Sequence, residues 1–285
     1  MTRLVRVELR RLFSRRLTFL AIFAAFVLAG IVVFATAMDA KPLSGVELQQ
    51  QEQMYQQALK DWKENGPEMV KSCLADQASQ QQIDPTADFG CDQMNPTHEN
   101  FGKPQPNVKE LMPLNLQTSA YLLSFIAFLL GAGFVAAEFS TGAIATWLTF
   151  EPRRLRVYAS KLIAAGMSVT PLAIVVIAII TAGTWVICSA WGSTALTSAQ
   201  GGDLLLSGLR VVTLTAAAAL VGAATGMLLR HTAAVIGAAM AYIVLVEGVF
   251  PNLLQNLQPW LVTNNIDAWV ANGTTYYAKT CRTQP

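Results

Sequence analysis

Few side chains in this sequence could carry out acid–base or metal chemistry, and those few are far apart. The 285 residues include only two histidines, His98 and His231, too few for a histidine-based metal site or a catalytic triad. A Gly-x-x-x-x-Gly-Lys phosphate loop is missing from the sequence, so this chain alone is not expected to hydrolyse ATP. We therefore expect no catalytic residues, cofactor or metal in this chain, and no enzyme activity.

The four cysteines could form disulfides. Cys73, Cys91, Cys188 and Cys281 all fall on the side of the membrane that the charge pattern below assigns to the outside. An oxidising compartment permits disulfides, and four cysteines allow three pairings. We predict the pairs Cys73–Cys91 and Cys188–Cys281. A zinc site is the alternative, although the tight Cys-x-x-Cys spacing of such sites is missing.

The elements that carry these residues are long and apolar. Hydrophobic residues make up 53% of the chain and charged residues 13%, with a mean hydropathy of +0.40, which excludes intrinsic disorder and a single soluble domain. A membrane-spanning helix needs about 20 apolar residues. Five blocks are long enough: 17–38, 111–137, 162–191, 204–229 and 232–250. The sequence therefore predicts an all-α polytopic membrane protein with five transmembrane helices.

The distribution of charge predicts the orientation of these spans. Residues 1–16 and 138–161, together with Arg230, carry a net charge of +8, whereas residues 39–110, 192–203 and 251–285 carry −6. Positive loops stay on the cytoplasmic side. We therefore place the N-terminus in the cytoplasm, residues 39–110 outside, and the protein in the cell membrane of a bacterium.

Two charges lie inside the apolar blocks. Arg210 and Glu247 are expected at similar depth in the outer half of the membrane, where they could pair as a gate or substrate contact. An ion pair that only joins spans four and five is an equally good interpretation, and Arg210 could also extend to the outer interface. Gly222 and Gly226 in span four indicate close helix packing.

The N-terminal residues predict an amphipathic interfacial helix. Val5, Leu9 and Leu12 follow helical spacing, continued by Phe13 and Leu17, and this apolar stripe would lie in the acyl boundary. The remaining faces carry arginines that would contact anionic membrane lipid: Arg3, Arg6, Arg10, Arg11, Arg15 and Arg16. A simple positive anchor for the first span is the alternative. Nucleic-acid binding is a poor fit because these arginines adjoin a membrane span.

The loop between spans two and three holds a distinctive order of residues. Span two ends in Ala-Glu-Phe with Glu138, followed by Thr141 and Gly142; further along come Pro152, Arg153 and Arg154, and Lys161 opens span three. Together with the N-terminal helix, this order resembles the permeases of type-two ABC exporters. The resemblance covers residues 1–38 and 114–250 in arrangement and 136–161 in motif. The alternative is a basic stop-transfer segment.

The resemblance implies partners and roles. In that family a short cytoplasmic helix in this loop docks into a cleft on a separate ATPase subunit. The ATPase-coupling residues here would be Glu138, Thr141, Gly142, Pro152, Arg153, Arg154 and Lys161. Cytoplasmic ABC ATPase subunits, which would hold ATP and Mg, would dock on residues 139–160 and on the N-terminal helix. A second permease copy or paralogue would complete the transport pathway.

The chain departs from this family in two respects. The family has six spans, so either a sixth follows residue 285 or the topology is unusual; we favour the former. The outer segment is also long: residues 46–70 favour a helix that packs on another surface, and five prolines between 84 and 113 favour coil. This segment is either a cap or partner-docking surface, or a solvated loop.

The expected organisation is therefore an interfacial helix at 1–16, a span at 17–38, an extracytoplasmic segment at 39–112, four spans within 113–250 with the coupling loop 138–161, and an outer tail at 251–285. We predict a permease subunit of an ATP-driven exporter that moves a substrate out of the cytoplasm or inner leaflet. The alternative is a non-transporting membrane sensor or anchoring subunit whose extracytoplasmic domain binds a ligand or protein partner.

Overall fold

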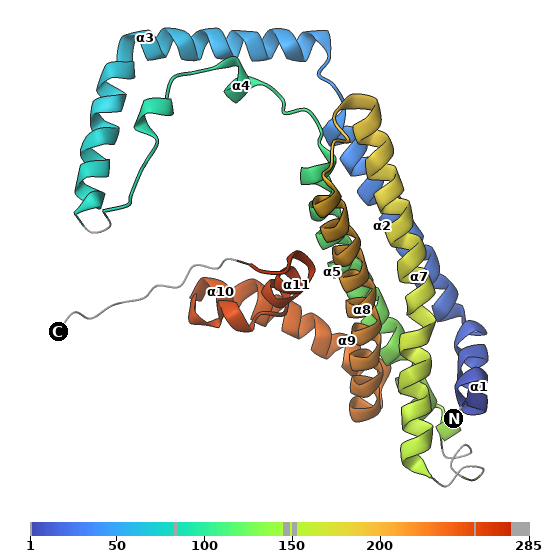
Figure 1. Ribbon diagram of the computed structural model, residues 1–285. Coiled ribbons are helices and arrows are strands. Elements are labelled where there is room, and N and C mark those ends of the chain that lie inside the picture. Colours follow the sequence, from blue (N-terminus) through green and yellow to red (C-terminus); the bar gives the residue numbers. More distant parts are fainter. Residues whose placement is uncertain (1, 83–84, 145–148, 150–152, 254, 275–285) are drawn as a thin grey trace, which may run out of the picture. The chain divides into compact units, whose positions relative to one another are not determined.

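The protein is helical along the part of the chain that can be described. The computed structural model describes residues 2–274 except 83–84, 145–148, 150–152 and 254. Within these residues five helices are long and apolar enough to cross a membrane: α2 (Arg16–Ala40), α5 (Val108–Ser140), α7 (Arg154–Trp191), α8 (Ser198–Leu229) and the stretch Thr232–Val249 (Figure 1). The prediction of an all-α polytopic membrane protein with five spans is confirmed.

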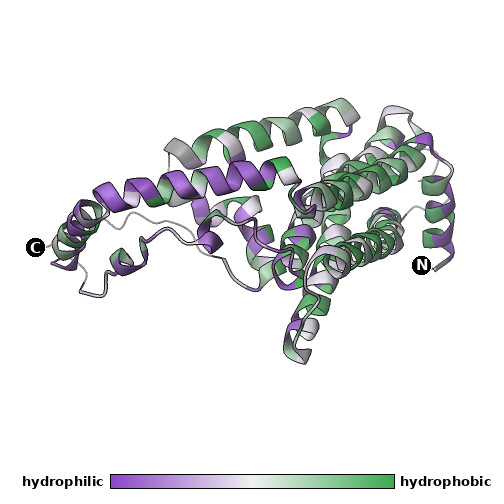
Figure 2. Ribbon diagram, turned by 90° about the horizontal axis from the view of Figure 1, so that it is seen from above, coloured by the Kyte–Doolittle hydropathy of each residue, from purple (hydrophilic) through white to green (hydrophobic). Residues whose placement is uncertain are grey.

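The chain divides into two compact units, residues 1–39 with 106–285 and residues 40–105. The first unit holds the spans, which Figure 2 colours largely hydrophobic, whereas the long helix of the second unit is largely hydrophilic. Each unit is described separately below.

The first unit is built around the pairing of α5 with α8. Small residues let the two backbones approach: a Cβ added at Gly222 would lie 2.0 Å from the carbonyl oxygen of Phe128, and one added at Gly131 would lie 2.2 Å from that of Ala219. In lipid, packing of this kind replaces the hydrophobic effect as the force that joins helices. The predicted packing role of Gly222 therefore agrees with the structure.

A buried polar contact joins α2 to α5 and α7. Asn115 on α5 donates from Nδ2 to Oγ1 of Thr184 on α7 at 2.8 Å, and its Oδ1 lies 3.2 Å from Oγ1 of Thr36 on α2. All three side chains are buried. Because α2 exposes most of its large apolar side chains, this contact is one of its few specific attachments to α5 and α7.

The last part of the first unit lies against α5 and α8. The fifth span consists of α9 (Thr232–Ala241) and a π-helix, η2 (Tyr242–Val249), and is followed by α10 (Phe250–Leu253), the 3₁₀-helix η3 (Gln255–Trp260) and α11 (Val262–Ala271). Ile266 and Val270 of α11 join the apolar core. Asp267 accepts hydrogen bonds from Gln117 and Tyr121 of α5. The helix α11 is therefore held by both apolar and polar contacts.

The second unit is a long helix with a returning strap. α3 (Gly45–Gln81) begins with a capping box between Ser44 and Glu47, and hydrogen bonds from Ser44 hold the pKa of Glu47 below its ordinary value. The strap contains η1 (Cys91–Gln93) and α4 (His98–Phe101), and the rings of His98 and Phe101 contact Tyr55 of α3.

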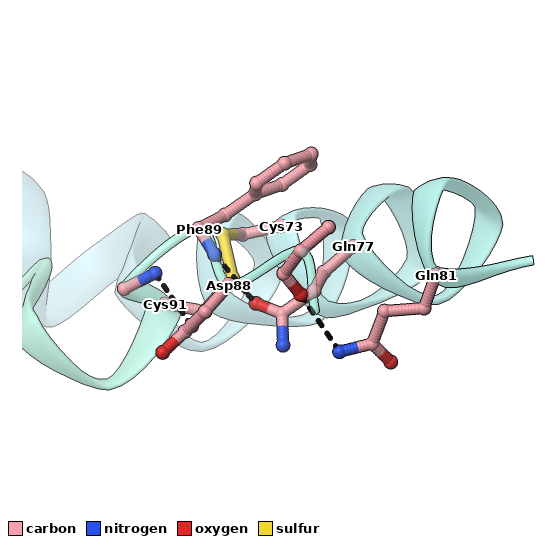
Figure 3. The surroundings of a disulfide bond; sticks show 8 residues. Cys73, Gln77, Gln81, Asp88, Phe89 and Cys91 are labelled. Carbon is pink, nitrogen blue, oxygen red and sulfur yellow. Dashed lines mark hydrogen bonds between the residues drawn. A yellow bond between two sulfur atoms is a disulfide. The ribbon is translucent and has the colours of Figure 1, made fainter. Parts of the chain in front are cut away.

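A disulfide attaches this strap to α3. Cys73 and Cys91 are bonded, with their Cα atoms 5.8 Å apart, which confirms the predicted pair. Beside the bond, the backbone N–H of Phe89 donates to Oε1 of Gln77 at 3.0 Å (Figure 3). In the other predicted pair, Cys281 lies outside the described residues, so that pair stays a prediction. Cys188 on α7 has no disulfide partner among the described residues, and it packs in the apolar core.

Candidate functional site

The loop between α5 and α7 begins with a defined helix end. Thr141 is the C-cap of α5, and its Oγ1 donates to the carbonyl oxygen of Ala137 at 2.8 Å. Gly142 follows with a φ of 72°, the left-handed conformation that ends many helices and that glycine adopts without a Cβ penalty. The Thr-Gly pair of the predicted motif is therefore the device that ends span two. Pro152 lies outside the described residues.

Four charged side chains gather where this loop meets the N-terminal helix α1 (Thr2–Phe13). Lys161 Nζ lies 3.0 Å from both carboxylate oxygens of Glu8 and also donates to Glu138 Oε2. Arg15 Nη2 donates to the other oxygen of Glu138 at 3.0 Å. We call this group, Glu8, Arg15, Glu138 and Lys161, the ion cluster.

The ion cluster is enclosed by protein. Lys161 is 0% exposed, Glu8 1% and Glu138 2%, whereas Arg15 is 28% exposed. The two carboxylates face Lys161 and Arg15, and Arg11 lies 3.9 Å from Glu138 as a third, more exposed cation. Burial raises the pKa of Glu8 and the neighbouring Lys161 opposes that increase. Removal of one partner would leave a buried charge without compensation, which is strongly destabilising.

Helical spacing brings these groups together. Phe134 and Glu138 lie one turn apart on α5, and Arg15 contacts both: its Nη1 donates to the Phe134 carbonyl oxygen at 2.9 Å. The Phe134 ring lies 5.1 Å from the Arg15 guanidinium and 5.4 Å from Lys161 Nζ, within the range of cation–π attraction. On α1, Glu8 and Leu12 are four residues apart and both are buried.

The predicted coupling residues differ in exposure, and their role in coupling stays a prediction. Glu138 and Lys161 are buried, so they do not belong to a surface on which a partner could dock directly. Thr141, Gly142, Arg153 and Arg154 are exposed. The predicted set therefore consists of an exposed group in the loop and an internal group that joins the loop to α1.

The arginines of the N-terminal helix also divide into two groups. Arg11 and Arg15 are partly buried, and their guanidinium nitrogens lie 3.9 Å and 3.0 Å from Glu138 Oε1. The exposed ones are Arg3, Arg6, Arg10 and Arg16. Leu12 packs with Phe134 in an apolar cluster, so this part of the apolar stripe contacts protein, contrary to the prediction that it lies in lipid. Contact of the exposed arginines with lipid remains a prediction.

Glu8 is the site residue that the sequence reasoning missed. It lies on the same helical face as Val5, Leu9 and Leu12. An acid within an apolar stripe is expected to be buried and paired. That signal was present in the sequence, although the identity of the partner was not.

The predicted pair of Arg210 and Glu247 is wrong. Arg210 Nη2 donates to Asn272 Oδ1 at 3.0 Å. Glu247 accepts from the backbone N–H of Val262 at 2.7 Å and from the hydroxyl of Thr263 at 2.6 Å. The first turn of α11 has free N–H groups that attract an acid, so Glu247 binds there. Each charge attaches the α11 region to a span, and the two do not bind each other.

Comparison with known proteins is consistent with this arrangement. Residues 4–268 match the family described as ABC-2 family transporter protein. Searches among curated proteins and among solved structures returned no match. The matched range includes all five spans, the loop and every member of the ion cluster. This family consists of multi-pass membrane permeases of ABC transporters, whose partners are ABC ATPases and which are usually dimeric. The chain belongs to the ABC-2 family of transporter proteins.

Proposed function

We propose that this permease is the membrane half of an ATP-driven exporter and that separate cytoplasmic ATPase subunits dock on residues 139–160. ATP and Mg would bind to those subunits. Closure of the ATPases would tilt the spans and move substrate out of the cytoplasm or the inner leaflet, along the interface with a second permease copy or paralogue. The export direction follows from the resemblance to type-two ABC exporters.

The observation that carries this proposal is the exposed start of α7. Arg153, Arg154 and Arg156 are exposed, and between them Leu155 is 83% exposed. An exposed leucine among arginines suits a protein partner that offers an apolar pocket with an acidic rim, because buried apolar anchors give affinity and complementary charge gives specificity. The charge pattern of the whole chain supports a cytoplasmic position for this segment.

The second unit supports the opposite position for residues 40–105. Its disulfide, Cys73–Cys91, is of a kind that persists in oxidising compartments. We assign this unit to the extracytoplasmic side, where it is available to an extracytoplasmic protein partner.

The proposal is tested by removing the exposed loop residues. In the variant Pro152→Gly, Arg153→Ser and Arg154→Gly, we expect normal membrane insertion but loss of the co-purifying ATPase and of its stimulation. A control variant, Lys60→Ser with Lys63→Ser, removes two exposed positive charges from α3 and should keep the ATPase bound. Normal ATPase binding and stimulation in the loop variant would show that docking does not occur there.

A further inference from the structure

The ion cluster connects both ends of the proposed docking loop to the N-terminal helix. Glu138 lies three residues before Thr141, where the loop begins, and Lys161 lies in the second turn of α7, which begins at Arg154. Lys161 binds Glu138 and Glu8 together. The two stems of the loop and α1 are therefore attached to one buried ammonium group.

We propose that Glu8, Glu138 and Lys161 are positioning residues for ATP-driven transport: they make α1 and the loop stems move as one body, so that force applied at the loop reaches the first span. This inference rests on the proposed function. It assigns the cluster a role in coupling beyond its contribution to stability.

The chain connectivity shows which transmembrane helix would move together with α1. α1 ends at Phe13 and α2 begins at Arg16, so two residues separate α1 from the first transmembrane helix. At this junction Arg15 binds Glu138 of α5, and Thr18 Oγ1 donates to the carbonyl oxygen of Leu12. A displacement of α1 must therefore be followed by the cytoplasmic end of α2.

The chemistry of the cluster favours a role in coupling over one in stability alone. Replacing a buried ion pair by well-packed apolar groups of similar size is often neutral or stabilising, whereas ion pairs can specify one arrangement of elements. Here the ammonium binds both oxygens of Glu8 at 3.0 Å. Leu12 provides an apolar contact between α1 and the spans, but such a contact is non-directional and would tolerate sliding. The ionic contacts fix the register of α1 against α7.

The test separates coupling from stability with a variant that lacks the three buried charges of the cluster. Lys161→Met alone leaves the buried Glu8 carboxylate without its hydrogen-bonded cation, whereas Glu138 keeps Arg15, and it should lower the thermal stability of the purified protein. The triple variant Glu8→Gln, Glu138→Gln and Lys161→Met removes all three buried charges, leaves the partly exposed Arg15, and should recover most of that stability. A control on the same helix, Ser168→Ala, removes a buried hydroxyl that bonds only within its own turn.

The deciding measurements are made on the complex with its co-purified ATPase. Spin labels are placed at Arg6→Cys and at Ile163→Cys on α7, both exposed positions, in a background that carries Cys188→Ala and Cys281→Ala. In wild type, the distance between the labels should stay unchanged on addition of ATP with vanadate. In the triple variant the distance should shift or broaden, and the stimulated ATPase rate should fall about fivefold or more, a typical size for a coupling between sites.

The possible results distinguish this inference from the proposal on which it rests. If the triple variant binds the ATPase and matches wild type in both the label distance and the stimulated rate, the cluster is only structural and the inference is wrong. If the ATPase does not bind even the wild-type protein, the proposed function fails, and the inference fails with it.

Discussion

The substitution Gly222→Ala tests the packing on which the bundle depends. The added Cβ would lie 2.0 Å from the carbonyl oxygen of Phe128 and 2.8 Å from its carbonyl carbon, whereas ordinary contact begins at 3.4 Å. Both atoms belong to backbone, which cannot rotate away as a side chain can. The helices α5 and α8 must therefore separate by about 1 Å or more, in a setting where close packing is the main force between helices.

The loss in free energy of unfolding caused by Gly222→Ala can be estimated from the neighbouring contacts. Overpacking of a well-packed core costs about 1–3 kcal/mol. Gly131 and Gly226 make similarly close approaches along the same pair of helices, so a separation at Gly222 loosens them as well. We therefore expect Gly222→Ala to lower the free energy of unfolding by about 3 kcal/mol, the upper end of that range. The apparent Tm should fall by about 5 °C or more.

The assay is the fraction of monodisperse protein that survives a heating series in detergent. The matched control is Gly237→Ala on α9, where an added Cβ meets nothing within 4 Å; it should leave the apparent Tm unchanged or slightly raised, because alanine favours helices. Equal apparent Tm values for the two variants would refute the close approach of α5 and α8.

Three further predictions address other parts of the chain. Burial raises the pKa of Glu8, so its contribution to stability is lost as pH rises through that pKa; melting curves from pH 4.5 to 8 should show a smaller decline for Glu8→Gln than for wild type, and parallel declines would contradict this. The double variant Cys73→Ser with Cys91→Ser removes the disulfide, which closes a loop with a sequence separation of 18, and should lower the free energy of unfolding by about 3 kcal/mol. Limited proteolysis should then cut the strap. Unchanged resistance to the protease would show that the disulfide does not hold the strap. Glu247→Gln weakens the contacts to the first turn of α11; hydrogen exchange should rise in residues 262–271, and unaltered protection would show that this carboxylate does not hold the helix.

The five spans could be predicted because each depends on a local property. An apolar run long enough to cross the bilayer must form a helix, since lipid offers no partner for unpaired backbone groups. The Cys73–Cys91 disulfide could be predicted for a similar reason, because the two cysteines are 18 residues apart within one short segment.

The errors concern partners that are distant in sequence. Arg210 and Glu247 were paired because their depths matched, but depth gives no position around a helix axis. The structure brings α11 beside them, and its backbone N–H groups and Asn272 bind the two charges separately. Nothing in the two charges themselves indicates that a later helix folds back against the spans.

The ion cluster is a second case in which the sequence alone did not predict partners that are distant in the chain. The sequence by itself determined that Glu138 closes a span, that Lys161 opens the next, and that the arginines lie on the predicted cytoplasmic side. Only the tertiary structure decided that Glu8, 153 residues from Lys161, completes the cluster and that two of the predicted coupling residues are buried. The physical reason is that a buried charge must find an opposite charge wherever the packed helices place one, and this position depends on how the helices pack.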